Sequence, residues 1–140
     1  MRIVYVDAGA FIAHLWARDD AYDRVHRHWR RLREADDLLV TCEPVVAETA
    51  TRLRYDAGLR CSLGFRELLD ASVVSGILRI RESDHELRQR AFDVIERYGD
   101  LALSYADATG AAVATETRAA AVFGLDHHFR IMGFDLEPPP

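Results

Sequence analysis

Four acidic residues stand where the local sequence predicts the end of a strand or the body of a helix. Asp7 follows the apolar run RIVYV, Glu48 lies in VVAETA, Asp107 in LSYADATG and Asp126 in VFGLDHHF. Carboxylates that converge repel one another, and a hard divalent cation relieves that repulsion. Because Mg²⁺ and Mn²⁺ take oxygen ligands and bind substrate phosphates, convergence of these acids would indicate phosphodiester chemistry.

Three of these acids also have a purely structural interpretation. Asp7 and Asp126 each stand where an aspartate caps the N-terminus of the following helix. Ser104 and Asp107 have the spacing of a capping box, in which the acid reaches back to the amide of the capping residue. The sequence leaves both interpretations open for each of the three.

Glu48 is harder to explain by local structure. It lies well past the first turn of its predicted helix, among small and apolar neighbours, where a charged side chain needs a partner. The structural alternative is a solvated glutamate, in particular one paired with Arg52 one helical turn later.

The elements that must position these acids alternate along the chain. Short β-branched and aromatic runs predict strands at Arg2–Val6, Leu38–Cys42, Ile77–Ile80 and Ala120–Phe123, with a short fifth at Phe134–Leu136. Amphipathic or alanine-rich stretches predict helices at Ala8–Ala17, Ala21–Glu34, Pro44–Gly58, Arg60–Ala71, Glu86–Tyr98 and Ser104–Glu116. This alternation predicts a parallel sheet covered by helices on both faces, with ligands at the C-terminal ends of its strands.

Length and composition narrow the class of protein. The 140 residues, 49% of them hydrophobic, suit a single domain over residues 1–137 followed by a proline tail at 138–140. The net charge of −5 argues against a broadly basic nucleic-acid surface. Cys42 and Cys61 lack the spacing of a zinc site or disulfide framework, and no leader or long apolar stretch is evident, so we expect a cytoplasmic protein.

The four acidic segments together resemble the motifs of the PIN-domain family. The resemblance rests on VYVDAGAFIA, VVAETATRL, LSYADATGAAVA and VFGLDHHF, and on a D-x-x-F ending at Asp126 and Phe129. The size and single-domain form resemble the VapC toxins of type II toxin–antitoxin systems, which are metal-dependent ribonucleases. The resemblance implies a three-layer α/β/α sandwich of four to five parallel strands in the order 3-2-1-4-5. It also implies a homodimer and a VapB-like antitoxin that covers the active-site groove.

Carried over to this chain, the resemblance implies a catalytic Mg²⁺ or Mn²⁺ site formed by Asp7, Glu48, Asp107 and Asp126. Asp7 and Asp107 would be the firmest direct ligands, and the other two would act partly through water. The implied activity is endoribonuclease cleavage of RNA that leaves 5′-phosphate and 3′-hydroxyl ends.

The chain departs from the usual family pattern beside two of these acids. Ala8 and Gly9 follow the first acid, where many relatives carry Ser, Thr or Asn, and Gly124 precedes the fourth, where many carry Thr or Ser. Outer hydrogen bonds orient metal ligands, so their loss predicts lower metal affinity or rate unless Ser104, Thr109, backbone amides or water replace them. A catalytically silent PIN-like module that binds protein or RNA is therefore the alternative function. A third alternative, a flavodoxin-like regulatory domain, leaves Glu48 unexplained.

Three arginines lie on one line of the second predicted helix. Arg24, Arg27 and Arg31 follow an i, i+3, i+7 pattern that would suit contacts to an RNA backbone or to acidic antitoxin residues. A solvated helix face is the plain alternative.

Aromatic and histidine side chains give weaker signals. Trp16, Trp29 and Phe65 could form a groove for an antitoxin helix, or they could be ordinary core or dimer-interface residues. His127 and His128 follow Asp126 in a D-H-H run that resembles a motif of much longer phosphoesterases, whose further motifs are absent here. We therefore expect the histidines to be structural or surface residues.

Overall fold

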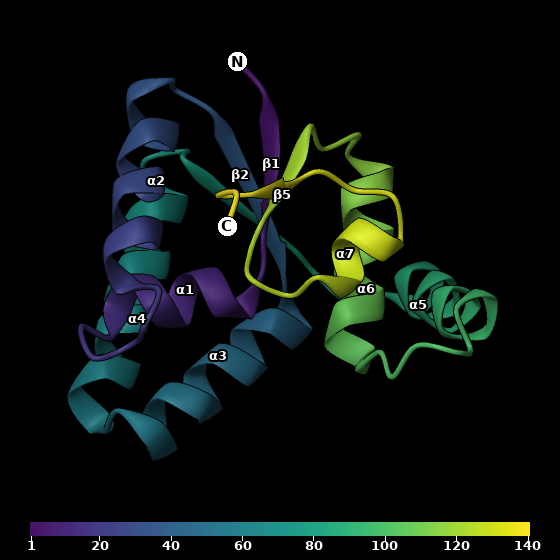
Figure 1. The fold of residues 1–140 in the computed structure, drawn as a ribbon, viewed down its shortest axis with the longest axis horizontal. Coiled ribbons are helices and arrows are strands. Elements are labelled where there is room, and N and C mark those ends of the chain that lie inside the picture. Colours follow the sequence, from purple (N-terminus) through teal and green to yellow (C-terminus); the bar gives the residue numbers. More distant parts are fainter.

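A computed structural model describes all 140 residues and has five parallel strands in the order β3-β2-β1-β4-β5, as expected (Figure 1). The strands are β1 (Ile3–Val6), β2 (Leu38–Cys42), β3 (Leu78–Arg81), β4 (Ala121–Phe123) and β5 (Leu136–Glu137). The helices are α1 (Ala8–Leu15), α2 (Tyr22–Glu34), α3 (Glu43–Asp56), α4 (Leu59–Val74), α5 (His85–Arg97), α6 (Tyr105–Glu116) and α7 (His128–Ile131). None of the seven helices has the length and apolarity to cross a bilayer.

Helices cover both faces of the sheet. In Figure 1, α1, α2 and α4 lie on one side and α5 and α6 on the other, while α3 crosses the end of the sheet where β2 finishes. This arrangement confirms the three-layer α/β/α prediction. Several predicted boundaries are wrong by two or three residues. The first helix ends at Leu15 instead of Ala17, the third at Asp56 instead of Gly58, and the fourth at Val74 instead of Ala71, while the fifth strand begins at Leu136 instead of Phe134.

The central strand β1 organises the site because the strand order reverses beside it. β1 pairs with β2 on one side and with β4 on the other, so the chain leaves β1 in one direction and later returns to its opposite edge. Val4, Tyr5 and Val6 are fully buried between the helical layers. The backbone N–H of Asp7 donates to the carbonyl of Phe123 at 2.9 Å and continues this pairing one residue beyond the strand. The first and fourth acidic segments therefore leave the sheet as neighbours.

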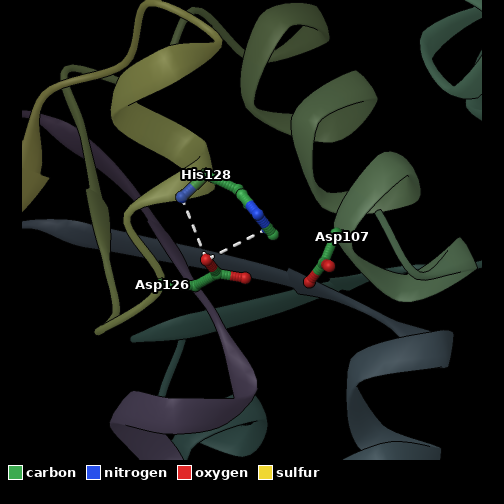
Figure 2. A group of neighbouring side chains, drawn as sticks. All are labelled: Asp107, Asp126 and His128. Atoms are coloured by element: carbon green, nitrogen blue, oxygen red, sulfur yellow. Dashed lines mark hydrogen bonds and ion pairs between the residues drawn. The ribbon is translucent and has the colours of Figure 1, made fainter. Parts of the chain in front are cut away.

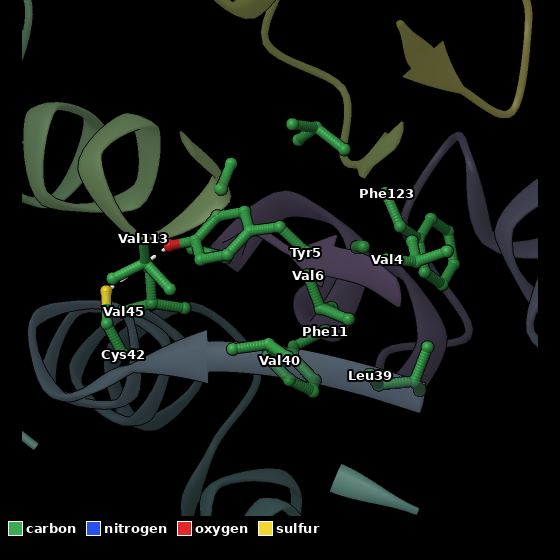
Figure 3. Close-up of a cluster of buried hydrophobic side chains, with 14 of the residues drawn as sticks. Val4, Tyr5, Val6, Phe11, Leu39, Val40, Cys42, Val45, Val113 and Phe123 are labelled. Atoms are coloured by element: carbon green, nitrogen blue, oxygen red, sulfur yellow. Dashed lines mark hydrogen bonds between the residues drawn. The ribbon is translucent and has the colours of Figure 1, made fainter. Parts of the chain in front are cut away.

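Tyr5 and Gly110 bring α6 close to β1. The Tyr5 side chain reaches beneath α6, where its hydroxyl lies 3.3 Å from the Cys42 thiol (Figure 3). A Cβ atom at Gly110 would lie 2.5 Å from that hydroxyl and 2.8 Å from the ring carbon that bears it. Glycine is therefore required here for close packing, and it lets the helix that carries Asp107 approach the strand that precedes Asp7.

The buried face of α2 confirms its predicted amphipathic pattern, and the burial of Trp29 and Phe65 contradicts the groove that these two residues were proposed to form with Trp16. Trp29 is 8% exposed and Phe65 1% exposed, and both pack against Phe11 with ring centroids 6.2 and 5.1 Å away. Trp16 is partly buried against the same core. Trp29 and Phe65 are core residues because burial within the sandwich leaves them no free surface for an antitoxin helix.

A stack of rings links α1 to α2 and makes stability depend on pH. His14 lies between His26 and Trp29, with ring centroids 4.9 and 4.6 Å away. Burial, and to a smaller extent the neighbouring His26, lowers the pKa of His14 to about 4. The unfolded chain takes up this proton near pH 6.5, so folding loses stability as pH falls from about 6.5 to 4.

We expect His14→Phe, which keeps a stacked ring but cannot titrate, to resist this loss. When the pH is lowered from 7.5 to 5, the free energy of unfolding of the variant should fall by about 1 to 2 kcal/mol less than that of the wild type. This figure allows for the partial exposure of His14. Urea unfolding at both pH values measures the difference. The exposed His85 supplies the control substitution His85→Phe, and an equal pH effect in the two variants would contradict the role of His14.

Candidate metal centre

An open cavity of about 380 Å³ lies beyond the ends of β1 and β4 and is lined by all four predicted acids. Asp7 follows β1, Glu48 comes from α3, Asp107 from α6, and Asp126 from the segment after β4. Four carboxylates separated by up to 119 positions in the sequence therefore face a common space. The spatial prediction that these four acids converge agrees with the structure.

Asp7 is the most deeply buried of the four, and it is not a helix cap. It occupies the position before α1 but makes no side-chain capping hydrogen bond. Only 5% of its surface is exposed, and its Oδ1 atom is buried without a hydrogen-bond partner. An acceptor oxygen buried in this way is costly unless something outside the protein satisfies it. The capping interpretation of Asp7 is therefore wrong.

The electrostatics of Asp7 reflect its burial and its acidic neighbours. Burial, together with the charges of Asp107, Glu48 and Asp126, raises the pKa of Asp7 to about 7, although the amide of Ala8 opposes the shift. Loss of hydration is the largest cause, and repulsion adds to it. The surroundings of Asp7 therefore disfavour its ionised form. An acid in such an environment is typical of a functional site.

Glu48 faces the same space from the second turn of α3. It is half-buried, and this partial burial and the charges of Asp107 and Asp126 raise its pKa. Arg52, one turn further on, also lines the cavity and lowers the pKa of Glu48 through its positive charge. Glu48 and Arg52 line the same cavity but form no ion pair, so the pairing expected from the structural alternative is not seen, and Glu48 lies with the other acids.

Asp107 combines a structural role with its position at the cavity. Its backbone N–H donates to the hydroxyl of Ser104 at 3.0 Å, and its Oδ2 accepts from the backbone N–H of Ser104 at 3.0 Å. This is the capping box that the spacing predicted. The box holds the carboxylate in one orientation, so Ser104 supplies an outer hydrogen bond of the kind expected to be scarce. Thr109 supplies none, since its hydroxyl donates to the carbonyl of Tyr105.

Asp126 lines the site but does not cap the following helix, because the N-cap of α7 is His127. Its Oδ1 accepts from the backbone N–H of His128 at 2.9 Å and lies 3.3 Å from Nδ1 of the same residue (Figure 2). Asp107, Asp126 and His128 each offer a ligand atom, and the three atoms lie within 4.8 Å of one another. Asp7 and Glu48 line the cavity outside this closest trio.

His128 lies with the acids, although it was expected to be a structural or surface residue. The D-H-H run resembles a motif of another enzyme class, but here the tight turn after Asp126 folds the second histidine back toward the acid. The signal was the i, i+2 spacing itself, which places an Asp side chain against the amide two residues later. Asp19, from the loop between α1 and α2, was also missed and lines the same cavity.

Close packing against Asp7 explains why position 124 is a glycine. A Cβ atom at this position would lie 3.0 Å from the Cβ of Asp7, tighter than an ordinary van der Waals contact. A side chain here would press directly on the buried acid. Gly124 therefore lacks the hydroxyl expected beside the fourth acid, and in its place the backbone packs closely against Asp7.

Of the three arginines predicted to bind RNA, only Arg24 lines a cavity. Arg24 is half-buried and lines a second cavity, together with His127 and Arg130. Arg27 and Arg31 are exposed and line neither cavity. The line of three on α2 is thus divided, and only its first member lies near the acidic site.

Comparison with known proteins identifies the family. The profile of the PIN domain matches residues 4–135. Mycobacterium tuberculosis VapC20, a sarcin-ricin loop cleaving toxin, has a similar fold, with a TM-score of 0.79, 23% identity and coverage of 94% of this chain and 95% of that one. FitAcB from Neisseria gonorrhoeae is similar with a TM-score of 0.65, 18% identity and 97% coverage of both chains. VapBC2 from Rickettsia felis, bound to a promoter DNA fragment, has a TM-score of 0.66, 14% identity, and coverage of 96% and 97%. No curated protein sequence gives a significant match. Because the profile spans nearly the whole chain, the protein belongs to the PIN domain family.

Proposed function

We propose that this chain is the toxin of a type II toxin–antitoxin pair and acts as a divalent-metal-dependent endoribonuclease of the VapC kind. The observation that carries the proposal is the convergence of four acids, remote in sequence, on one open cavity. Membership of the PIN domain family supports a nuclease. VapC20, which has the same fold, is described as a toxin that cleaves the sarcin-ricin loop, and this supports RNA as the substrate.

The residues present suit a divalent cation. Oxygen donors dominate the cavity, and the buried Oδ1 of Asp7 has no partner within the protein. We assign Asp7, Glu48, Asp107 and Asp126 as the residues that hold the metal, with His128 beside them. Carboxylates suit Mg²⁺ and Mn²⁺, and a nearby imidazole favours Mn²⁺ of these two because it is the softer ion.

In the proposed mechanism the protein orients the RNA and accepts a proton from the attacking water. A bound cation would activate a water and stabilise charge on the phosphate oxygens. Glu48, half-buried and with a raised pKa, would accept the proton of the attacking water at a carboxylate oxygen. The capping box keeps Asp107 turned toward the cavity, and Ile12 and Leu125 give that cavity apolar walls. The products would carry 5′-phosphate and 3′-hydroxyl ends.

The partner we propose is a VapB-like antitoxin that covers the cavity, with the toxin itself a homodimer. The neighbours with the same fold include VapBC2 and FitAcB, each of which is named by two components. This supports such a partner without specifying its contacts.

Purified protein incubated with RNA tests the function directly. Cleavage should require Mg²⁺ or Mn²⁺ and stop when a chelator is added. Asp107→Asn should reduce the rate by at least about 100-fold, since loss of even an outer partner of a metal ligand costs about 10- to 100-fold. Asp93→Asn, the same change at an exposed position on α5, is the matched control. Cleavage that survives both the chelator and Asp107→Asn would refute the proposal, and folded protein that binds RNA without cleaving it would favour the silent binding module.

A further inference from the structure

A second cavity, of opposite charge, adjoins the acidic one. It has a volume of about 160 Å³ and shares Leu125 with the first cavity as a common wall. Its basic lining residues are Arg24 from α2, His127, and Arg130 from α7, and none of its lining residues is acidic. The segment from Gly124 to His127 thus separates a carboxylate-lined space from one lined by cationic groups.

Neither arginine of this second cavity forms an ion pair. Arg2, Arg81 and Arg90 are the arginines of this chain that pair with acids. Most arginines here are unpaired, so what sets Arg24 apart is its partial burial at the cavity. The Nε–H of Arg24 is buried without a hydrogen-bond partner. A buried donor left in this state loses its hydration without compensation, so it indicates a site where an external acceptor binds.

The size and chemistry of the second cavity suit a phosphate group as the external hydrogen-bond acceptor. A space of about 160 Å³ corresponds to about five water molecules, enough for a phosphate group but not for a nucleotide base with its sugar. The guanidinium group donates along two parallel directions that match phosphate oxygens. Leu136, Pro138 and Pro140 complete the wall with apolar surface and offer no competing acceptor side chain.

We propose that Arg24 and Arg130 bind a phosphate of the RNA backbone that neighbours the scissile phosphate. This inference rests on the proposed function, which places the scissile phosphate in the acidic cavity. A polynucleotide crossing Leu125 then meets metal-neutralised acids on one side and unpaired arginines on the other. The arginines fix the register of the strand over the acids, and they do so without reading base identity.

RNA binding measured separately from cleavage tests this assignment. In the inactive Asp107→Asn background, fluorescence anisotropy with a labelled RNA in Mg²⁺ buffer gives the affinity. Arg24→Gln and Arg130→Gln should each weaken binding on the order of tenfold, because each removes a charge-assisted hydrogen bond. Each should also reduce the slope of log K against log salt by about 0.7, the value expected for one lost phosphate contact on a single strand.

Arg27→Gln and Arg31→Gln are the matched controls, since they remove the same charge from the same helix outside both cavities. Compared with Arg24→Gln, Arg24→Lys should restore part of the slope of log K against log salt. If Arg24→Gln misfolds, Arg130→Gln still decides the test, because Arg130 is exposed. Equal losses in the test and control variants would overturn the assignment, as would unchanged RNA binding with weakened binding of an antitoxin. If the wild type still cleaves RNA in that case, the proposed function stands. If the wild type does not cleave, the function itself fails.

Discussion

Asp7→Asn is expected to abolish cleavage and, in the presence of a chelator, to make the protein more stable than the wild type. Burial raises the pKa of Asp7 to about 7, so the ionised form weakens the folded state at pH 8. At 1.36 kcal/mol per pKa unit this penalty is about 4 kcal/mol at most. A buried Asn still loses hydration, so the net gain should be about 2 kcal/mol, or about 5 °C in the melting temperature.

The pH dependence of that gain follows from the same shift. The unfolded chain releases the proton near pH 3.8 and the folded chain near pH 7, so Asp7 lowers stability progressively as pH rises between these values. The advantage of Asp7→Asn should therefore be larger at pH 8 than at pH 5. Thermal unfolding in chelator at both pH values measures it, with Asp93→Asn as the exposed control.

Adding Mn²⁺ should reverse the order of the two proteins. Excess metal stabilises a protein that binds it by about 2.7 kcal/mol at 100 times the dissociation constant, and the variant has lost a proposed ligand. An Asp7→Asn protein that is less stable than the wild type in chelator at pH 8 would contradict the electrostatic account of Asp7. Cleavage at the wild-type rate by that variant would contradict its proposed role.

Gly110→Ala is expected to destabilise the protein by about 3 kcal/mol and to impair the site from a distance. The new methyl group would lie 2.5 Å from the Tyr5 hydroxyl, and Tyr5 is fully buried in the central strand. Forced overpacking of this kind costs about 1 to 3 kcal/mol or somewhat more. Relief requires α6 to move away from β1, which separates Asp107 from Asp7 and should lower metal affinity.

Gly64→Ala supplies the matched control, because a Cβ atom at Gly64 in α4 would meet nothing within 4 Å. That change should stabilise the protein by about 0.5 to 1 kcal/mol through helix propensity alone. Denaturant unfolding and Mn²⁺ calorimetry measure both effects. Shortening the tyrosine in the double variant Tyr5→Leu/Gly110→Ala should offset part of the loss, and strictly additive effects would show that Tyr5 is not the obstacle.

Sequence periodicity predicted which segments are helices and which are strands, but it did not predict all of their boundaries. β2 was predicted with its observed bounds because LLVTC is a short, mainly apolar run that stops just before Pro44, which marks the first turn of the next helix. The fifth strand was misplaced because Phe134 is apolar but packs its ring against Phe129, with centroids 6.2 Å apart. Pairing of Leu136 with Val122 and of Glu137 with Phe123 defines the strand instead. A two-residue edge strand depends on its neighbour's backbone, which no local pattern records.

The sequence alone pointed to four of the acids that line the cavity, because residue type and spacing relative to the predicted elements are properties of the chain; it did not point to Asp19. It also determined the sheet order, through the resemblance to PIN domains. Only the tertiary structure decided that Oδ1 of Asp7 is left without a partner, while Asp107 completes the capping box of Ser104 and Asp126 accepts from the amide of His128. It likewise brought His128 to the acids, buried Trp29 and Phe65, and placed Arg24, but not Arg27 or Arg31, at a cavity. The physical reason is common to all of these: burial and charge environment arise from packing, and packing is not a local property of sequence.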